Sequence, residues 1–250
     1  MKHFKAIQTI KNFVKKLDLD LSEQKVLTEI GSENYIYTPL IPYIAGAKKI
    51  LVWCRDSKYG KAVDIIKEFN EVCEVTNIEP DNIVFRINER PDIDIQEADI
   101  ITNSGAIRPI DKYMISKISS KTVIPLMFEA WELRSTDIDI SECKLANIRV
   151  AGTWENHPSI KVFDYIGHLI VKLIFQANIE IFDSSLFIWS SDAFGNKAEE
   201  TIKKLEAREV TVSTNLDLLY SKISHIDCLV ICDYNEKRKY FGDYGIMDIS

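Results

Sequence analysis

Strand-length apolar runs alternate with amphipathic segments along most of this chain. Runs such as "KKILVWC", "NIVFRI" and "TVIPLMFEA" have the length of strands, whereas "SKYGKAVDIIKEFNEVC" repeats its apolar residues at the spacing of one helix face. Continuously apolar strands that alternate with helices are typical of a mostly parallel sheet covered on both faces. The pattern therefore predicts an α/β fold.

The alternation falls into two blocks on either side of a long apolar helix pattern. We expect an N-terminal amphipathic helix over 1–24, a Rossmann-like α/β domain over 25–155, a linking helix over 156–182 and a second Rossmann-like domain over 183–250. The second block has three candidate strands, fewer than a full doubly wound domain has. An open sheet edge of this kind favours pairing with a second copy of the chain, so a homodimer is expected.

Composition limits the classes of partner. The 250 residues are 46% hydrophobic, enough to build real cores, and the net charge of −7 disfavours nucleic acid as a partner. No run approaches the roughly 20 apolar residues of a membrane span, and the first helix lacks the features of a signal peptide. We expect a soluble, cytoplasmic protein that binds a small molecule and no membrane.

The cysteines are odd in number, and three of them lie inside apolar runs. They are Cys54, Cys73, Cys143, Cys228 and Cys232. No histidine or further cysteine completes a zinc-binding spacing near any of them. We expect reduced core residues and no metal site.

Ligands of open α/β sheets bind beyond the carboxyl ends of the strands, so the segments that follow the strands are the candidate sites. Gly31 and Ser32 allow a tight turn after the first strand, and Asp56, 25 residues later, is placed to bind a ribose diol. Ser57 follows it. The same residues also fit an ordinary strand-to-helix turn with a helix cap, and the neighbouring Arg55 leaves open a phosphorylated ribose.

Two later strand ends carry further polar residues. In "TNSGAIRP", Asn103 and Ser104 are candidates to touch a ligand and Arg108 is a candidate to bind a carboxylate or phosphate, although Asn-Ser-Gly is equally ordinary turn chemistry. In "FEAWELR", Glu129 and Arg134 follow an apolar strand and suit either a structural or a catalytic role.

One histidine is favoured as a general acid or base. His157, in "GTWENHP", lies in a loop between the predicted domains, beside Glu155, and histidine is the residue type used most often as a general acid or base. A hinge residue before Pro158 is the competing interpretation. The predicted catalytic set is therefore His157, Glu129, Arg108 and Arg134.

From about Ala98 to Ser250 the order of elements resembles the D-2-hydroxyacid dehydrogenase family, of the formate/glycerate dehydrogenase-like fold. The resemblance rests on "DIDISECKLANIRVAGT", the helix "KVFDYIGHLIVKLIF" and the strand and turn "SLFIWSSDAFG". It implies a dinucleotide turn at 190–195. There Ser190 and Asp192 replace the first two glycines of the family motif and Gly195 keeps the third.

A second, shorter resemblance concerns the first domain. "KKILVWCRDSKYGKA" followed by "ADIITNSG" is similar to the nucleotide domains of the shikimate dehydrogenase type. It implies that the first domain is a rival location for a cofactor.

These observations predict an NAD(P)-dependent, oxidoreductase-like protein that acts on a small anionic substrate in an interdomain cleft. NAD or NADP is the expected cofactor. Two alternatives stay open: a cofactor-free binding or biosynthetic accessory protein that keeps the dehydrogenase-like fold, and a nucleotide- or sugar-binding enzyme without redox chemistry.

Overall fold

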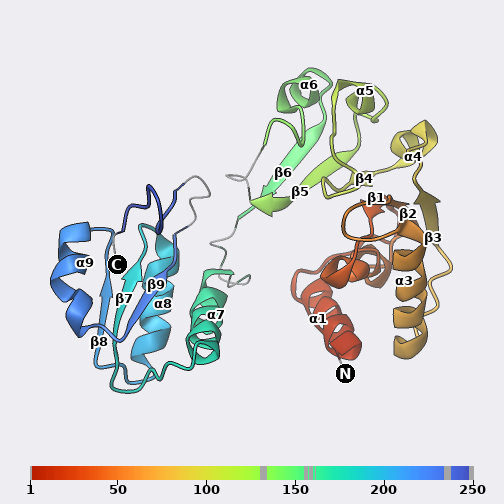
Figure 1. The fold of residues 1–250 in the computed structure, drawn as a ribbon. Helices are drawn as coiled ribbons and strands as arrows, with labels where there is room; N and C mark the ends of the chain where they lie inside the picture. The colour runs from red at the N-terminus through yellow and green to blue at the C-terminus, as the bar shows by residue number, and fades with distance from the viewer. Residues whose placement is uncertain are drawn as a thin grey trace. The chain divides into compact units, whose positions relative to one another are not determined.

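The computed structural model describes residues 2–129, 134–154, 157, 160, 162–233 and 238–247. It divides the chain into two compact units, 1–154 and 155–250. Both units are Rossmann-like and every described strand pairing is parallel, which confirms the predicted α/β class with two lobes (Figure 1).

The first unit is built on a sheet of six strands in the order β3-β2-β1-β4-β5-β6. The strands are β1 (Lys25–Glu29), β2 (Lys49–Cys54), β3 (Ile83–Ile87), β4 (Ile100–Ile101), β5 (Val123–Glu129) and β6 (Arg149–Thr153). This is the 3-2-1-4-5-6 order of the doubly wound fold, in which the chain changes direction across the sheet between β1 and β4.

Helices cover this sheet on both faces. They are α1 (Lys2–Lys16), the 3-10 helix η1 (Glu33–Tyr37), α2 (Leu40–Ile44), α3 (Ala62–Thr76), α4 (Asp92–Glu97), α5 (Lys112–Ile115) and α6 (Ile140–Leu145). The N-terminal helix α1 packs against α2 and α3, so it is part of the first unit.

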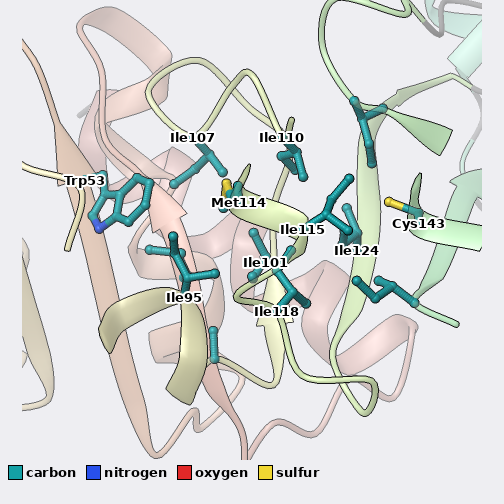
Figure 2. Packing of buried hydrophobic residues seen from close by; sticks show 14 of the residues in the cluster. Trp53, Ile95, Ile101, Ile107, Ile110, Met114, Ile115, Ile118, Ile124 and Cys143 are labelled. Atoms are coloured by element: carbon teal, nitrogen blue, oxygen red, sulfur yellow. The ribbon is translucent and has the colours of Figure 1, made fainter. Parts of the chain in front are cut away.

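The strand residues of β2 alternate between two hydrophobic clusters. Ile50 and Val52 belong to the cluster under α1 and α3, whereas Leu51 and Trp53 belong to the cluster under α4, α5 and α6. Figure 2 shows the second cluster, in which Trp53 and Ile95 lie at one end and Cys143 at the other. Successive side chains of a strand point to opposite faces, so a continuously apolar strand fills both cores.

The second unit has a three-stranded sheet in the order β8-β7-β9. Its elements are α7 (Val162–Gln176), β7 (Ser185–Trp189), α8 (Ala193–Lys203), β8 (Glu209–Val212), α9 (Leu216–Lys222), the 3-10 helix η3 (Ile223–His225) and β9 (Cys228–Ile231). The helix expected to link the lobes, over 156–182, is observed as α7, and it packs on α8 inside the second unit.

The cysteines are all unpaired, and Cys54, Cys73 and Cys143 are buried, as expected of reduced core residues. Burial raises the pKa of Cys54 to about 11, with a smaller contribution from the charges of Glu29 and Asp56. A thiol with such a pKa is almost entirely protonated at neutral pH and is a weak nucleophile.

We predict that Gly167→Ala destabilises the second unit. A Cβ at Gly167 would lie 2.0 Å from Thr201 Oγ1 and 2.9 Å from the carbonyl oxygen of Lys197, so α7 and α8 would have to separate. The expected loss is about 1–3 kcal/mol in the free energy of unfolding, measured by urea denaturation. In an open helix the same change would add roughly 1 kcal/mol. A gain in stability would therefore contradict the close packing, and the exposed Lys172→Ala is the control, expected within about 0.5 kcal/mol of wild type.

Candidate functional site

The sheet of the first unit brings the predicted cofactor-binding loops to one edge. β1 lies between β2 and β4, and all three strands run parallel. The segments that follow them therefore leave the sheet side by side, at the carboxyl edge beside the switch point between β1 and β4. Gly31 and Ser32 follow β1, Asp56 and Ser57 follow β2, and 103–104 follows β4.

Buried polar side chains concentrate at this edge. Half of the buried polar side chains among the described residues lie at the ends of β1 and β4; they are Thr28, Glu29, Thr102, Asn103 and Ser104. The hydroxyls of Thr28 and Thr102 are 3.0 Å apart, and that of Ser104 is 3.4 Å from Thr102. Burying polar groups lowers stability unless they are paired, so this concentration of polar side chains makes the carboxyl edge the candidate site.

Asn103 is fully buried and only half satisfied. Its Oδ1 accepts a hydrogen bond from the backbone N–H of Met127 in β5, at 2.6 Å. Its Nδ2 has no hydrogen-bond partner among the described residues. The side chain thus ties β4 to β5 and leaves an amide donor at the switch point without an acceptor.

Glu29 is a member of the candidate site that the sequence analysis did not single out. It is the last residue of β1 and is 5% exposed, and its carboxylate accepts a hydrogen bond from the backbone N–H of Ala106 in the loop after β4. A Cβ at Gly105 would lie 2.2 Å from Glu29 Oε2, so only glycine lets the loop approach the carboxylate this closely. The available signal was a glutamate at the end of the strand "KVLTE", directly before the predicted turn at Gly31.

The loop after β1 is a short turn. The N–H of Gly31 donates to the carbonyl of Tyr35 at 3.4 Å, and Ser32 precedes the five-residue 3-10 helix η1 without capping it through its side chain. No long helix begins here. The aligned backbone N–H groups that a dinucleotide turn offers to a pyrophosphate are therefore few at this position.

Asp56 holds the start of α3. Its Oδ1 accepts from the backbone N–H of Ala62 at 2.9 Å, and its Oδ2 accepts from Lys61 Nζ at 3.1 Å. The backbone hydrogen bond first, and Lys61 second, lower the pKa of Asp56 below its usual range. Ser57 forms a local turn, in which its hydroxyl accepts from the N–H of Tyr59. The N-cap position of α3 is Lys61, which makes no side-chain cap, so the Asp56 carboxylate satisfies the first helical N–H from outside the helix, without help from Ser57.

The two arginines of the predicted catalytic set converge on one carboxylate. Arg108 Nη1 lies 2.9 Å and Arg134 Nε 3.5 Å from Oδ2 of Asp137, which is largely buried. Two guanidinium groups share a single negative charge, so the cluster keeps a net positive charge. Arg134 is well exposed and can offer N–H donors to a ligand.

The other two predicted catalytic residues are only partly described. Glu129 ends β5, but its side chain lies outside the described part of the structure. His157 is exposed and belongs to the second unit.

In the second unit the turn after β7 is closed by its own side chains. Asp192 caps α8 by accepting from the N–H of Phe194 at 2.9 Å, and Ser190 Oγ accepts from the N–H of Gly195 at 3.1 Å. The Ser190 hydroxyl also donates to Asp192 Oδ1 at 3.0 Å. A carboxylate and a hydroxyl therefore occupy the N–H groups at which a Rossmann turn receives a pyrophosphate.

Gly195 keeps the packing role of the third glycine in such a turn. A Cβ there would lie 2.4 Å from Ser190 Cβ, so the helix can approach β7 this closely only with glycine. The turn thus keeps the close approach of helix and strand that a dinucleotide turn has, but the side chains of Ser190 and Asp192 occupy the position of the anion.

No protein-family model matches the sequence, and no curated protein matches it. Solved structures match its fold: the A chain of dipicolinate synthase from Bacillus subtilis is 13% identical, with 88% of this chain and 70% of that chain covered and a TM-score of 0.47. A D-isomer-specific, NAD-binding 2-hydroxyacid dehydrogenase from Polaromonas is 12% identical over 77% and 68%, with a TM-score of 0.41. Shikimate 5-dehydrogenase from Listeria monocytogenes, solved with shikimate and NAD, is 8% identical over 58% and 50%, with a TM-score of 0.38. Likeness at this level concerns the Rossmann-like fold alone.

Neither a metal site nor a membrane-spanning helix is found in the described part of the chain. No group of three or more His, Cys, Asp or Glu side chains there is arranged to hold a metal ion. No helix among the described residues is long and apolar enough to cross a membrane.

We predict that Gly105 and Glu29 are energetically coupled. Gly105→Ala should cost about 1–3 kcal/mol in the free energy of unfolding, because the new methyl group would collide with the buried carboxylate. In a Glu29→Ala background the same substitution should cost clearly less, because the carboxylate is gone. A double-mutant cycle by urea denaturation measures the difference, and equal costs in both backgrounds would show that the two groups do not meet.

We predict that Asp192→Ala lowers the free energy of unfolding by about 1 kcal/mol, because α8 loses its N-cap. Glycine is a better cap residue than alanine, so Asp192→Gly should cost less. Thermal and urea denaturation of the two variants measure this order, and a larger loss for glycine would contradict the capping role.

Proposed function

We propose that this chain is an NAD(P)-dependent, oxidoreductase-like protein whose nucleotide binds at the carboxyl edge of the first sheet. The buried polar cluster at the β1/β4 switch point carries the proposal, because it lies where doubly wound sheets bind their ligands. The orphaned Nδ2 of Asn103 supports it, because a buried donor without a partner is costly unless a ligand or a rearrangement satisfies it. The nicotinamide would supply the hydride chemistry.

The proposed substrate is a small anion. Arg108 and Arg134 hold one carboxylate between them, so a second carboxylate can join the cluster and balance its remaining positive charge. In this scheme Arg134 binds the substrate and Arg108 anchors the cluster through Asp137. His157 is the proposed proton donor or acceptor, and Glu129, at the end of β5, is a further proposed catalytic residue.

A second candidate is a binding or accessory protein that works without a cofactor. The Ser190–Asp192 pair favours it, because a carboxylate at the start of α8 repels the pyrophosphate that this turn would otherwise receive. The two candidates differ in whether any nicotinamide nucleotide binds the wild-type chain.

We predict that a nicotinamide nucleotide stabilises the wild-type chain against heat. A ligand at 100 times its dissociation constant adds roughly 2.7 kcal/mol, which a thermal-shift titration with NAD, NADH, NADP and NADPH detects. Ser32→Trp, which fills the turn after β1, should abolish the shift. Ser191→Trp, which places the same side chain in the turn after β7, should leave it unchanged.

Two other outcomes of this titration would contradict the proposal. If no nucleotide stabilises wild type, but one stabilises Asp192→Gly, the second lobe is a disabled cofactor site and the chain works without a nicotinamide. If the shift is lost in Ser191→Trp and kept in Ser32→Trp, the nucleotide binds the second lobe and the proposed location is wrong.

A further inference from the structure

Arg55 reaches from the end of β2 toward the loop after β4. It is the first residue after β2, and its Nη2 lies 3.4 Å from the carbonyl oxygen of Gly105. Because β1 separates β2 from β4 in the sheet, this side chain crosses the carboxyl edge beside the switch point. Arg55 is exposed and this contact is long, so most of its N–H donors face solvent.

A second guanidinium is attached to the same loop. Arg90 donates to the carbonyl of Ile107 at 2.6 Å and lies over the ring of Trp53, 5.0 Å from its centroid. Burial of the guanidinium lowers the pKa of Arg90, the negative charge of Asp111 raises it, and the positive charge of Arg55 lowers it by a smaller amount. Arg55 and Arg90 thus contact different carbonyl groups of the same loop. An anion bound beside this loop would be attracted by both guanidinium groups.

The carboxylate beside them is already engaged. Asp56 Oδ1 accepts a hydrogen bond from the first N–H of α3, and its Oδ2 accepts one from Lys61. A ribose diol would have to compete with both donors. The loop 55–61 holds three cations, Arg55, Lys58 and Lys61, against this one carboxylate. In doubly wound folds, an acidic residue after the second strand binds the hydroxyls of an unmodified ribose when its carboxylate has no other partner. An arginine at this place binds a ribose 2′-phosphate.

We propose that the carboxyl edge of the first sheet selects a phosphorylated ribose, with Arg55 as the residue that contacts the phosphate. This inference rests on the proposed function and narrows it to NADP(H) in preference to NAD(H). A phosphate monoester carries close to two negative charges near neutral pH, and the planar guanidinium fork binds two of its oxygens at once. Asp56 then acts as the cap of α3 and not as a ribose ligand.

The test compares two small probes that differ by the 2′-phosphate. Isothermal titration calorimetry with 2′,5′-ADP and with 5′-AMP, followed by NADPH and NADH, is run on the full chain. We expect the 2′-phosphorylated member of each pair to bind about tenfold or more tightly, the size of a charge-assisted hydrogen-bond pair. Arg55→Gln should remove this preference while it leaves the affinity for 5′-AMP within about twofold.

Two variants separate the effect of positive charge from that of the planar guanidinium group of Arg55. Lys58→Gln removes one positive charge from the same loop and should keep most of the preference for 2′,5′-ADP. Arg55→Lys keeps the charge and loses the planar fork, so its preference should be intermediate. Equal losses in Lys58→Gln and Arg55→Gln would overturn the assignment of Arg55 as a specific contact.

Failure of this inference is distinguishable from failure of the proposed function. Equal binding of NADH and NADPH by wild type, or tighter binding of NADH, would overturn the preference for a phosphorylated ribose and leave an NAD(P) protein standing. Binding of none of the four nucleotides would overturn the proposed function and the inference with it.

Discussion

The parallel sheet of the first unit imposes the constraint on which the remaining features depend. When all strands run the same way, every strand ends at the same edge, and polar residues that follow them are gathered there whatever their separation in sequence. Glu29 and Ala106 meet in this way across 77 positions, and Thr28 meets Thr102 across 74. Both faces of the sheet are filled by apolar side chains, so this edge is where the sheet can carry chemistry.

The buried carboxylate of Glu29 explains the local sequence of the loop after β4. A carboxylate that leaves water needs a donor, and the backbone N–H of Ala106 supplies one only if the loop comes very close. The residue at the closest approach, Gly105, has no Cβ to prevent this. The loop then continues to Arg108, whose guanidinium reaches Asp137, so one buried group helps to position the proposed anion cluster two residues further on.

The fold was predictable from local patterns, because burial on both faces leaves a continuous apolar run in each strand, as in "KILVWC". The pairing of β1 with β4 was not, since nothing local in the two-residue β4 specifies its neighbours. The same limit applies to the site. Turn chemistry pointed to Asn103 and Ser104, but the contacts of Glu29 and Arg55 with the loop after β4 depend on sheet order. Asp56 shows the opposite case, in which a local helix-capping interaction competes with the functional interpretation.

The two lobes differ in the groups that they place where a Rossmann-like fold binds an anion. A helix that starts beyond a central strand presents unpaired N–H groups and attracts negative charge. In the second lobe Ser190 and Asp192 satisfy those groups internally, so the start of α8 already carries its anion. In the first lobe the element after β1 is a short 3-10 helix with little dipole, and arginines around the loop after β4 supply the positive charge instead. Guanidinium groups on flexible side chains can adapt to a ligand, whereas a capped helix start cannot, and this asymmetry is why we assign anion recognition to the first lobe.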